Sequence, residues 1–217
     1  GTGGLSASSL GVKANKTLDG TLKAVGEFEA GLAINTGVVS NGAVANGINQ
    51  TAASSGGLTG TGSQIFSRQA YIGLSGDLGT FSVGRQYTYS YIAAAGIGAA
   101  MGGGFFGNSA TLLPSIGGMP TRWNNSLVYK SPSMGGLSTY VTYSTGAQND
   151  VPADTALTAT TTSNDKAGQG YDLGFNYTAG PLVAVLTTWN YNNTSYATVG
   201  ETALATKQGV QLAANYD

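Results

Sequence analysis

Apolar and polar residues alternate along much of this chain with a period of two, which is expected of β-strands that have two different faces. The clearest case is the segment 171–177 (YDLGFNY), where Tyr, Leu, Phe and Tyr alternate with Asp, Gly and Asn. The segments 137–144 and 208–217 show the same alternation. On this basis we predict nine strands, at residues 5–16, 21–34, 65–76, 80–87, 125–132, 137–145, 171–179, 181–191 and 207–217.

The connections between these strands are alternately short and long. The short ones contain the Gly, Pro and Asp residues that tight hairpins need, and they lie at residues 18–20, 76–79, 133–136 and 179–181. The long ones are polar and lie at residues 35–64, 87–121, 146–170 and 192–206. A soluble β-sandwich would show the same alternation of faces, but compact soluble domains seldom contain several loops of this length. Short turns on one rim and long loops on the other are typical of transmembrane β-barrels.

Composition favours the same class. Charged residues make up 9% of the chain, against roughly 25% in typical soluble domains, while 35 residues are glycine and the mean hydropathy is +0.01. We therefore predict an all-β fold, a transmembrane antiparallel β-barrel with apolar side chains toward lipid and polar side chains toward water. In the segment 181–191, the face with Val185, Trp189 and Tyr191 is the more apolar one, and we expect it to face lipid.

Several chemistries lack the residues that they require. The chain has no Cys and no His, which excludes a disulfide scaffold, thiol chemistry and most histidine-based hydrolase and zinc sites. It contains neither a GxSxG nucleophile motif nor a phosphate-binding loop with GK[ST]. We therefore expect no enzymatic activity, no cofactor and no metal site. The net charge of −1 and the scattered basic residues give no reason to expect nucleic-acid binding.

One long stretch of the chain carries no charge. Between Arg85 and Arg122 no residue is acidic or basic, and the segment 84–107 (GRQYTYSYIAAAGIGAAMGGGFFG) is rich in glycine. Each glycine disfavours a helix by about 1 kcal/mol, so we predict that this segment is not helical. Its role depends on the residues that flank it.

Those flanking residues carry a family resemblance. Residues 67–87 (SRQAYIGLSGDLGTFSVGRQY) and 122–144 (RWNNSLVYKSPSMGGLSTYVTYS) closely resemble the trimeric general porins of Gram-negative outer membranes. Residues 9–32 (SLGVKANKTLDGTLKAVGEFEAGL) resemble the second and third strands of that family. The resemblance runs through residues 1–217 and implies a single barrel domain of sixteen strands. Nine strands cannot close such a barrel, so we expect this chain to lack the first strand, part of the second and about six at the C-terminal end.

The resemblance also implies a constriction in the pore. In these porins the loop between the fifth and sixth strands folds inward, and residues 87–121 lie at that place; the alternative is a disordered outer loop. Charges around the constriction set ion selectivity. Arg68 and Arg122 match wall arginines of the family. A third family arginine is replaced here by Ser9, and we expect Lys13, four residues further on, to substitute for it in part.

The loop has no acidic residue, so we expect a basic wall that faces neutral backbone and gives a weak to moderate anion preference. Glu27 and Glu29 share the inward face with Lys23 and are expected to cancel part of the positive charge. Arg68 and Arg85 have the strand parity of apolar residues, and strict alternation would point both into lipid at a cost of about 2–4 kcal/mol. We expect either a bulge or a subunit interface to resolve this conflict. The alternative role for each arginine is a structural salt bridge or an interfacial anchor.

We interpret the chain as part of an outer-membrane porin through which small hydrophilic solutes and ions diffuse passively. The resemblance implies a homotrimer in contact with outer-membrane lipid and lipopolysaccharide. One alternative is a substrate-selective channel with a stacking track of aromatic residues, Tyr87, Tyr89, Tyr91, Phe105 and Phe106. A less favoured alternative is a secreted β-rich adhesin or binding module.

Overall fold

The structure is a computed structural model that describes residues 8–34, 38–40, 65–100, 119–146, 168–192 and 206–216. These residues form strands and one α-helix. The elements are β1 (Ser9–Asp19), β2 (Leu22–Ala33), β3 (Val38–Ser40), β4 (Gln69–Gly76), β5 (Gly79–Tyr87), α1 (Tyr89–Ala100), β6 (Arg122–Lys130), β7 (Leu137–Ser144), β8 (Gly170–Ala179), β9 (Leu182–Asn192) and β10 (Thr206–Tyr216). The central parts of the long connections, and with them Phe105 and Phe106, lie outside the described residues.

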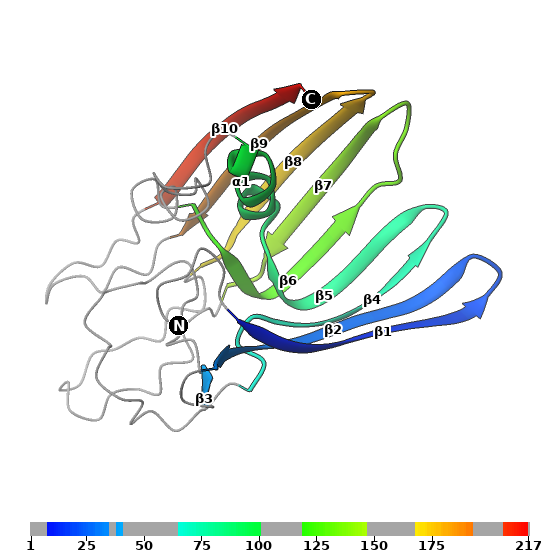
Figure 1. The fold of residues 1–217 in the computed structure, drawn as a ribbon, viewed down its shortest axis with the longest axis vertical. Coiled ribbons are helices and arrows are strands. Elements are labelled where there is room, and N and C mark those ends of the chain that lie inside the picture. The colour runs from blue at the N-terminus through cyan, green and yellow to red at the C-terminus, as the bar shows by residue number, and fades with distance from the viewer. Residues whose placement is uncertain are drawn as a thin grey trace, which may run out of the picture.

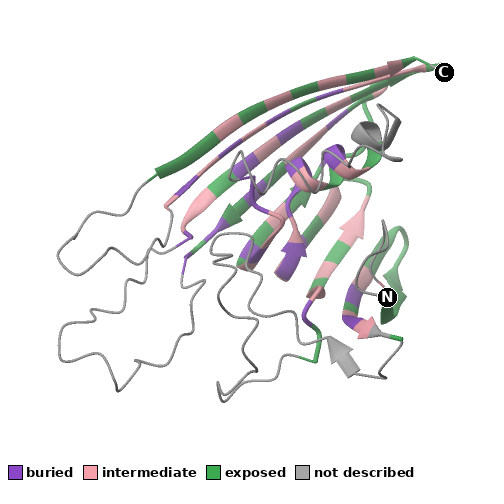
Figure 2. Ribbon diagram, turned by 60° about the vertical axis from the view of Figure 1, so that its left-hand side comes forward, coloured by how far each residue is buried: buried purple, intermediate pink, exposed green. Residues whose placement is uncertain are grey.

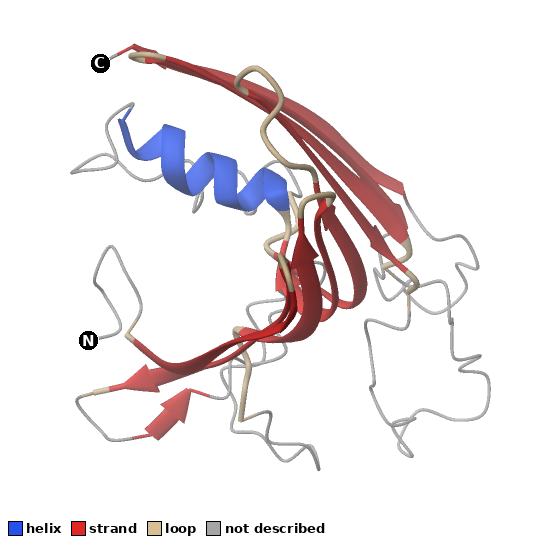
Figure 3. Cartoon of the chain, turned by 90° about the vertical axis from the view of Figure 1, so that its right-hand side faces the viewer, coloured by secondary structure: helices blue, strands red, loops and turns tan. Residues whose placement is uncertain are grey.

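The strands form one antiparallel sheet in which each strand pairs with its neighbours along the chain. The order is β1-β2-β4-β5-β6-β7-β8-β9-β10, and β3 pairs with the end of β2 (Figure 1). The sheet is strongly curved, and α1 lies on its concave side (Figure 3). This up-and-down order is that of a barrel wall, and it confirms the predicted fold class and all nine predicted strands.

Several bounds differ from the prediction; β1 ends at Asp19 and not at 16, and β4 begins at Gln69 and not at 65. Residues 38–40 were expected to lie in a long loop but form β3, because Val38 and Val39 favour an extended backbone and the edge of β2 offers a partner. The strand expected at 125–132 begins earlier, at Arg122, and pairs with β5 across a bulge.

The short turns lie where the sequence predicts them. β1 turns into β2 at Gly20, and β8 turns into β9 at Gly180. Both glycines have left-handed backbone angles, with φ of 51° and 56°, which side chains other than glycine adopt at a cost. These hairpins link adjacent strands along one edge of the sheet (Figure 1).

The two faces of the sheet differ in chemistry. The convex face carries apolar side chains that are exposed, with Leu10 at 69% and Leu212 at 77% of full exposure. The concave face carries Gly, Ser, Asn and charged residues on β1 and β2, with Lys13 opposite Glu27 in the register of these strands. Figure 2 shows the resulting alternation of exposure along the strands. On β8 the predicted apolar face is the exposed one, since Tyr171 and Phe175 lie on it.

The orientation predicted for β9 was wrong. Trp189 pairs with Asp172 and Val185 pairs with Asn176, so the apolar face of β9 shares the concave side with the polar face of β8. Val185, Trp189 and Tyr191 are at most 3% exposed because α1 and neighbouring side chains cover them. The strands that carry a helix need apolar side chains where the helix packs. The two-residue period of apolar positions does not distinguish a face covered by a helix from one that contacts lipid.

The prediction that the glycine-rich segment is not helical was also wrong, because α1 spans Tyr89–Ala100. Within this range Gly96 and Gly98 are outnumbered by alanines, and the densest glycines follow from position 102 onward. A helix of this length is marginal in isolation, so contacts with the sheet are needed to stabilise it. No helix within the described part of the chain is long and apolar enough to cross a membrane.

The character of the two faces leads to a first prediction. Leu212 lies near the middle of β10 on the convex face, whereas its neighbour Gln211 lies on the concave face. If the convex face contacts lipid, Leu212→Arg should lower the free energy of unfolding by about 2–4 kcal/mol. Gln211→Arg, the matched control, should change it by much less. Urea unfolding in phospholipid vesicles measures both values, and equal destabilisation by the two variants would contradict the assignment of the faces.

Candidate functional site

The pairing of β5 with β6 has a bulge beside Arg85, with the extra residue in β6. The register shifts between Gly84 and Gln86, and Gly84 has a φ of 132° that favours glycine. Arg85 is 8% exposed, and its Nε donates a hydrogen bond of 2.7 Å to the backbone oxygen of Ser67. Its Nη1 donates to Oδ1 of Asn124. A bulge is thus present beside Arg85, and both predicted explanations for its parity stay predictions.

Arg68 avoids the parity problem differently, since it lies just before β4 and strand alternation does not apply to it. Its backbone N–H donates to the backbone oxygen of Glu29 at 3.0 Å. Its Nε lies 2.9 Å from Oε1 of Glu29. The hydroxyl of Ser9 also hydrogen-bonds to this carboxylate. Arg68 thus has the salt-bridge role that the sequence left as an alternative.

Tyr87 connects the arginines to one another. The guanidinium carbon of Arg122 lies 4.2 Å from the centroid of the Tyr87 ring, and that of Arg68 lies 5.9 Å from it, both within the range of cation–π attraction. Arg122 also donates a hydrogen bond to the Tyr87 hydroxyl. Arg85 is near enough to Arg122 for the two positive charges to repel each other. We call Arg68, Arg85, Arg122, Tyr87 and Glu29 the arginine cluster.

Lys13 and Glu27 form a second charged group one step along the wall. Nζ of Lys13 lies 3.1 Å from Oε1 of Glu27, and the hydroxyl of Tyr71 donates to Oε2 at 3.1 Å. Glu27 is nearly buried, whereas the Lys13 side chain is 77% exposed. The lysine therefore keeps most of its hydration while it partly neutralises the acid.

The structure thus brings most of the predicted site residues into these two groups. The expected cancellation of charge by Glu27 and Glu29 is confirmed and takes the form of direct ion pairs. The partners of Arg68 and Lys13 lie on the wall itself, so the expectation that the wall faces a loop without acidic residues stays a prediction. Arg122 differs, since the described residues offer it no carboxylate within ion-pair distance.

The two ends of the connection between β5 and β6 are hydrogen-bonded to each other. The backbone N–H of Thr88 donates to the backbone oxygen of Thr121 at 3.1 Å, and the Thr88 hydroxyl donates to the backbone oxygen of Pro120. The same hydroxyl oxygen accepts a bond of 3.3 Å from the N–H of Tyr91. Thr88 therefore caps the N-terminus of α1 and ties it to the returning segment.

The first turn of α1 lies against β8 and β7, where sequence reasoning placed no site. The N–H of Ser90 donates to the carboxylate of Asp172, at 3.3 Å to Oδ1 and 3.2 Å to Oδ2. The ring of Tyr89 stacks on that of Tyr140, with centroids 3.6 Å apart. Burial raises the pKa of the Tyr89 hydroxyl well above its ordinary value, and the neighbouring Tyr140 and Asp172 act in the same direction. The sequence did hold a signal for this contact. Asp172 is an acidic residue on the inward face of a predicted strand, and Gly174, two residues later, leaves space beside it.

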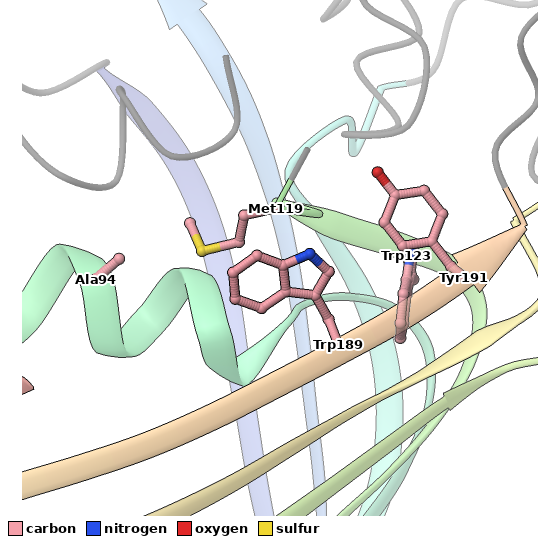
Figure 4. Packing of buried hydrophobic residues seen from close by; sticks show 5 residues of the cluster. All are labelled: Ala94, Met119, Trp123, Trp189 and Tyr191. Carbon is pink, nitrogen blue, oxygen red and sulfur yellow. The ribbon is translucent and has the colours of Figure 1, made fainter. Parts of the chain in front are cut away.

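Farther along α1, an apolar cluster joins the helix to the wall. Ala94, Met119, Trp123, Trp189 and Tyr191 pack together and are all 3% exposed or less. Figure 4 shows Met119 beside the Trp189 indole, with Trp123 and Tyr191 next to each other. The rings of Trp123 and Tyr191 meet edge to face at 6.1 Å. The cluster holds α1 and the returning residue Met119 against the same part of β9.

The predicted aromatic track is not a row of free rings. Tyr87 stacks on Tyr91 with centroids 5.1 Å apart and also contacts Arg122. Tyr89 is 6% exposed against Tyr140. The three tyrosines are therefore engaged in contacts within the protein. Among the described residues, no group of three or more His, Cys, Asp or Glu side chains is placed to hold a metal ion.

Solved structures with the same fold are outer-membrane proteins. The chain is similar to an anion-selective porin from Comamonas acidovorans, with a TM-score of 0.58 and 20% identity over 99% of this chain and 55% of that one. It is similar to a loop-deletion mutant of OmpT from Vibrio cholerae, with a TM-score of 0.55 and 15% identity over 96% and 56% of the two chains. It is also similar to Salmonella typhi OmpF in complex with daunomycin, with a TM-score of 0.54 and 17% identity over 94% and 53%.

This chain therefore spans about half the length of the porins that it matches. A comparison with curated protein sequences gives no match. The model of the Gram-negative porin family, in contrast, matches residues 1–217. With that match, a polar concave wall and a helix seated against it, the chain belongs to the Gram-negative porin family, whose members are channels of the outer membrane and not enzymes.

Proposed function

We propose that the complete protein forms a water-filled channel for the passive diffusion of small hydrophilic solutes and ions across the outer membrane. The observation that carries this proposal is the contrast between the two faces of the wall. The convex face exposes apolar side chains such as Leu10, Val12 and Leu212, which suit lipid. The concave face carries the ion pairs Lys13–Glu27 and Arg68–Glu29, which require a hydrated lumen.

Residues 87–121 are proposed as the constriction loop of this channel. Their described part supports the assignment, because α1 packs on the concave faces of β7, β8, β9 and β10. Irregular backbone is tolerated at membrane depth only where it is buried in protein or lines water, and the lumen provides both conditions. The complete barrel is expected to have sixteen strands and to assemble as a homotrimer in contact with lipid and lipopolysaccharide, as the family resemblance implies.

A weak anion preference follows from the arginine cluster. It places three guanidinium groups beside one carboxylate, that of Glu29, so its local charge is positive. The described part of α1 is uncharged and does not oppose this charge. The pairing of Lys13 with Glu27 removes most of the contribution that Lys13 was expected to make. The similarity to a porin described as anion-selective supports the same sign.

A substrate-selective channel is the second candidate, and the structure favours it less. Such a channel would need aromatic faces that are free to stack on a sugar or a similar ring. Tyr87, Tyr89 and Tyr91 instead contact Arg122, Tyr140 and one another. The adhesin alternative does not agree with membership of a channel family.

Single-channel recording of the natural full-length protein in a planar bilayer tests the proposal. Across a KCl gradient, we expect stable openings in groups of three and a reversal potential that indicates a modest preference for chloride. A preference for potassium would contradict the role of the arginine cluster but leave the channel intact. Failure to form any channel would overturn the proposed function.

The sign of the selectivity should respond to single charges. A unit charge about 6 Å from an ion in water contributes about 0.7 kcal/mol, which corresponds to roughly a threefold change in local ion concentration. Glu29→Gln removes the acid beside Arg68 and should raise the chloride-to-potassium permeability ratio by about this factor. Arg122→Gln should lower the ratio by a similar factor. Reversal potentials in the same KCl gradient measure both changes.

Asp77→Asn is the matched control for Glu29→Gln, because it removes the same charge from the turn between β4 and β5. At 3.3 Å per residue, β4 separates this turn from the arginine cluster by about 26 Å. The control should leave the permeability ratio unchanged at physiological ionic strength, since charges at this distance are screened. An equal shift in both variants would mean that the overall charge of the protein sets selectivity, and not the cluster.

A further inference from the structure

The first turn of α1 is attached to the wall by a buried acid. Asp172 lies on the concave face of β8 and is fully buried. Both of its carboxylate oxygens accept hydrogen bonds from the N–H of Ser90, and the backbone of Tyr89 donates to it as well. These N–H groups belong to the start of α1, where no earlier turn supplies acceptors.

A buried carboxylate requires compensation, which usually comes from a basic side chain. The two ion pairs of the described residues are Lys13–Glu27 and Arg68–Glu29, and neither involves Asp172. The favourable partner of Asp172 is the N-terminus of α1, where N–H groups and the helix dipole provide partial positive charge. The acid and the helix therefore depend on each other, and the acid is placed to bind α1 and not an ion from the lumen.

The surface of β7 and β8 is also shaped to receive the first turn of α1. Gly174 is the next inward residue of β8 after Asp172, and it lies opposite Tyr140 of β7. A Cβ atom added at Gly174 would overlap the ring of Tyr89. The glycine therefore leaves the space in which Tyr89 stacks on Tyr140. Asp172, Gly174 and Tyr140 together form a socket for the start of α1, and we call these three residues the α1 socket.

Beyond its first turn, α1 contacts the wall through small side chains that pack against large ones. Among the α1 side chains whose burial the structure describes, those buried beyond the first turn are Ala93 and Ala94, which have one methyl group each. One methyl group has little apolar surface, so these two side chains hold the twelve-residue helix only together with the large apolar residues of the wall. The hydrogen bonds to Asp172 therefore act together with the apolar cluster around Ala94 in attaching α1.

We propose that Asp172 is a positioning residue that holds α1 against the wall and thereby sets the width of the lumen. This inference rests on the proposed channel function, because α1 narrows a pore only if the complete protein forms one. Asp172 does not select solutes by contact, since it is buried beneath the helix. It acts through the position of α1.

The absence of cysteine from the chain allows a direct test of this attachment. Ala94→Cys places a thiol on the face of α1 that is fully buried, and Ile92→Cys places one on the same helix at a position that is 48% exposed. In the otherwise unchanged protein, the first thiol should react slowly with a maleimide and the second should react quickly. The two reporters separate release of α1 from general unfolding.

Asp172→Leu removes the acceptor and keeps a similar volume. Because hydrogen bonds to a charged group are among the stronger ones, it should speed the labelling of Ala94→Cys by about ten- to a hundredfold and leave Ile92→Cys unchanged. Asp172→Asn keeps one acceptor oxygen and should show a smaller increase. Unchanged labelling of Ala94→Cys in Asp172→Leu would overturn the proposal. Equal acceleration of both reporters would overturn it as well, because it would show a global loss of structure.

If Asp172→Leu does not fold, Gly174→Ala tests the same socket with the acid in place. Its added methyl group displaces Tyr89, so it too should speed the labelling of Ala94→Cys. Gly96→Ala is the matched control, since a Cβ at Gly96 has no atom within 4 Å. That control should not speed labelling, and an acceleration by it equal to that of Gly174→Ala would contradict the socket.

Channel recordings complete the test. Asp172→Leu should increase the conductance and admit larger neutral solutes in liposome swelling, while Asp172→Asn should stay close to the unchanged protein. Labelling does not depend on channel activity, so the two proposals fail separately. A protein that forms no channel but shows the labelling pattern would overturn only the proposed function. A channel whose conductance is the same in all variants would overturn the positioning role of Asp172.

Discussion

The need to pair every backbone N–H and C=O group in lipid is the constraint on which the rest of this structure depends. An antiparallel sheet meets it through the continuous pairing of β1 to β10, with each strand beside its neighbours in the chain. Once the strands are paired, consecutive side chains must point to opposite sides. One side can then be apolar and the other charged, and a helix and two ion pairs can occupy the concave side without cost to the side that faces lipid.

This constraint explains why so much of the fold could be predicted from sequence. Alternation over β8 and hairpin residues such as Gly20 and Gly180 are local signals, and the structure confirms both. The errors arose where contacts between distant segments decide the outcome. The apolar face of β9 turns inward because α1 covers it, and α1 is helical because Thr88 and Asp172 cap it. Neither fact can be recovered from the residues of β9 or α1 alone.

The candidate site shows the same division. The alternation placed Lys13, Glu27 and Glu29 on one face and the family resemblance placed Arg68 and Arg122 on the wall, but neither indicated which side chains form pairs. Partner choice depends on the register between β1, β2 and β4, because a shift of one residue would turn the side chains of a strand to the opposite face. The result is a concave face on which charges are mostly balanced at close range, with the excess positive charge concentrated around Tyr87. In the proposed channel, such an arrangement would give a weak field confined to a short part of the ion path.

The hydrogen bond between Thr88 and Thr121 has a consequence for how this protein can change. The pairing of β5 with β6 extends to Tyr87 and Arg122, and the hydrogen bond between the two threonines follows directly after it. The strand pairing is therefore complete before the connecting segment begins. Residues can then be gained or lost between the two threonines without altering the register of any strand. In the proposed channel, the width of the lumen and the assembly of the barrel are therefore separable traits, and selection can alter the proposed constriction while it preserves the wall.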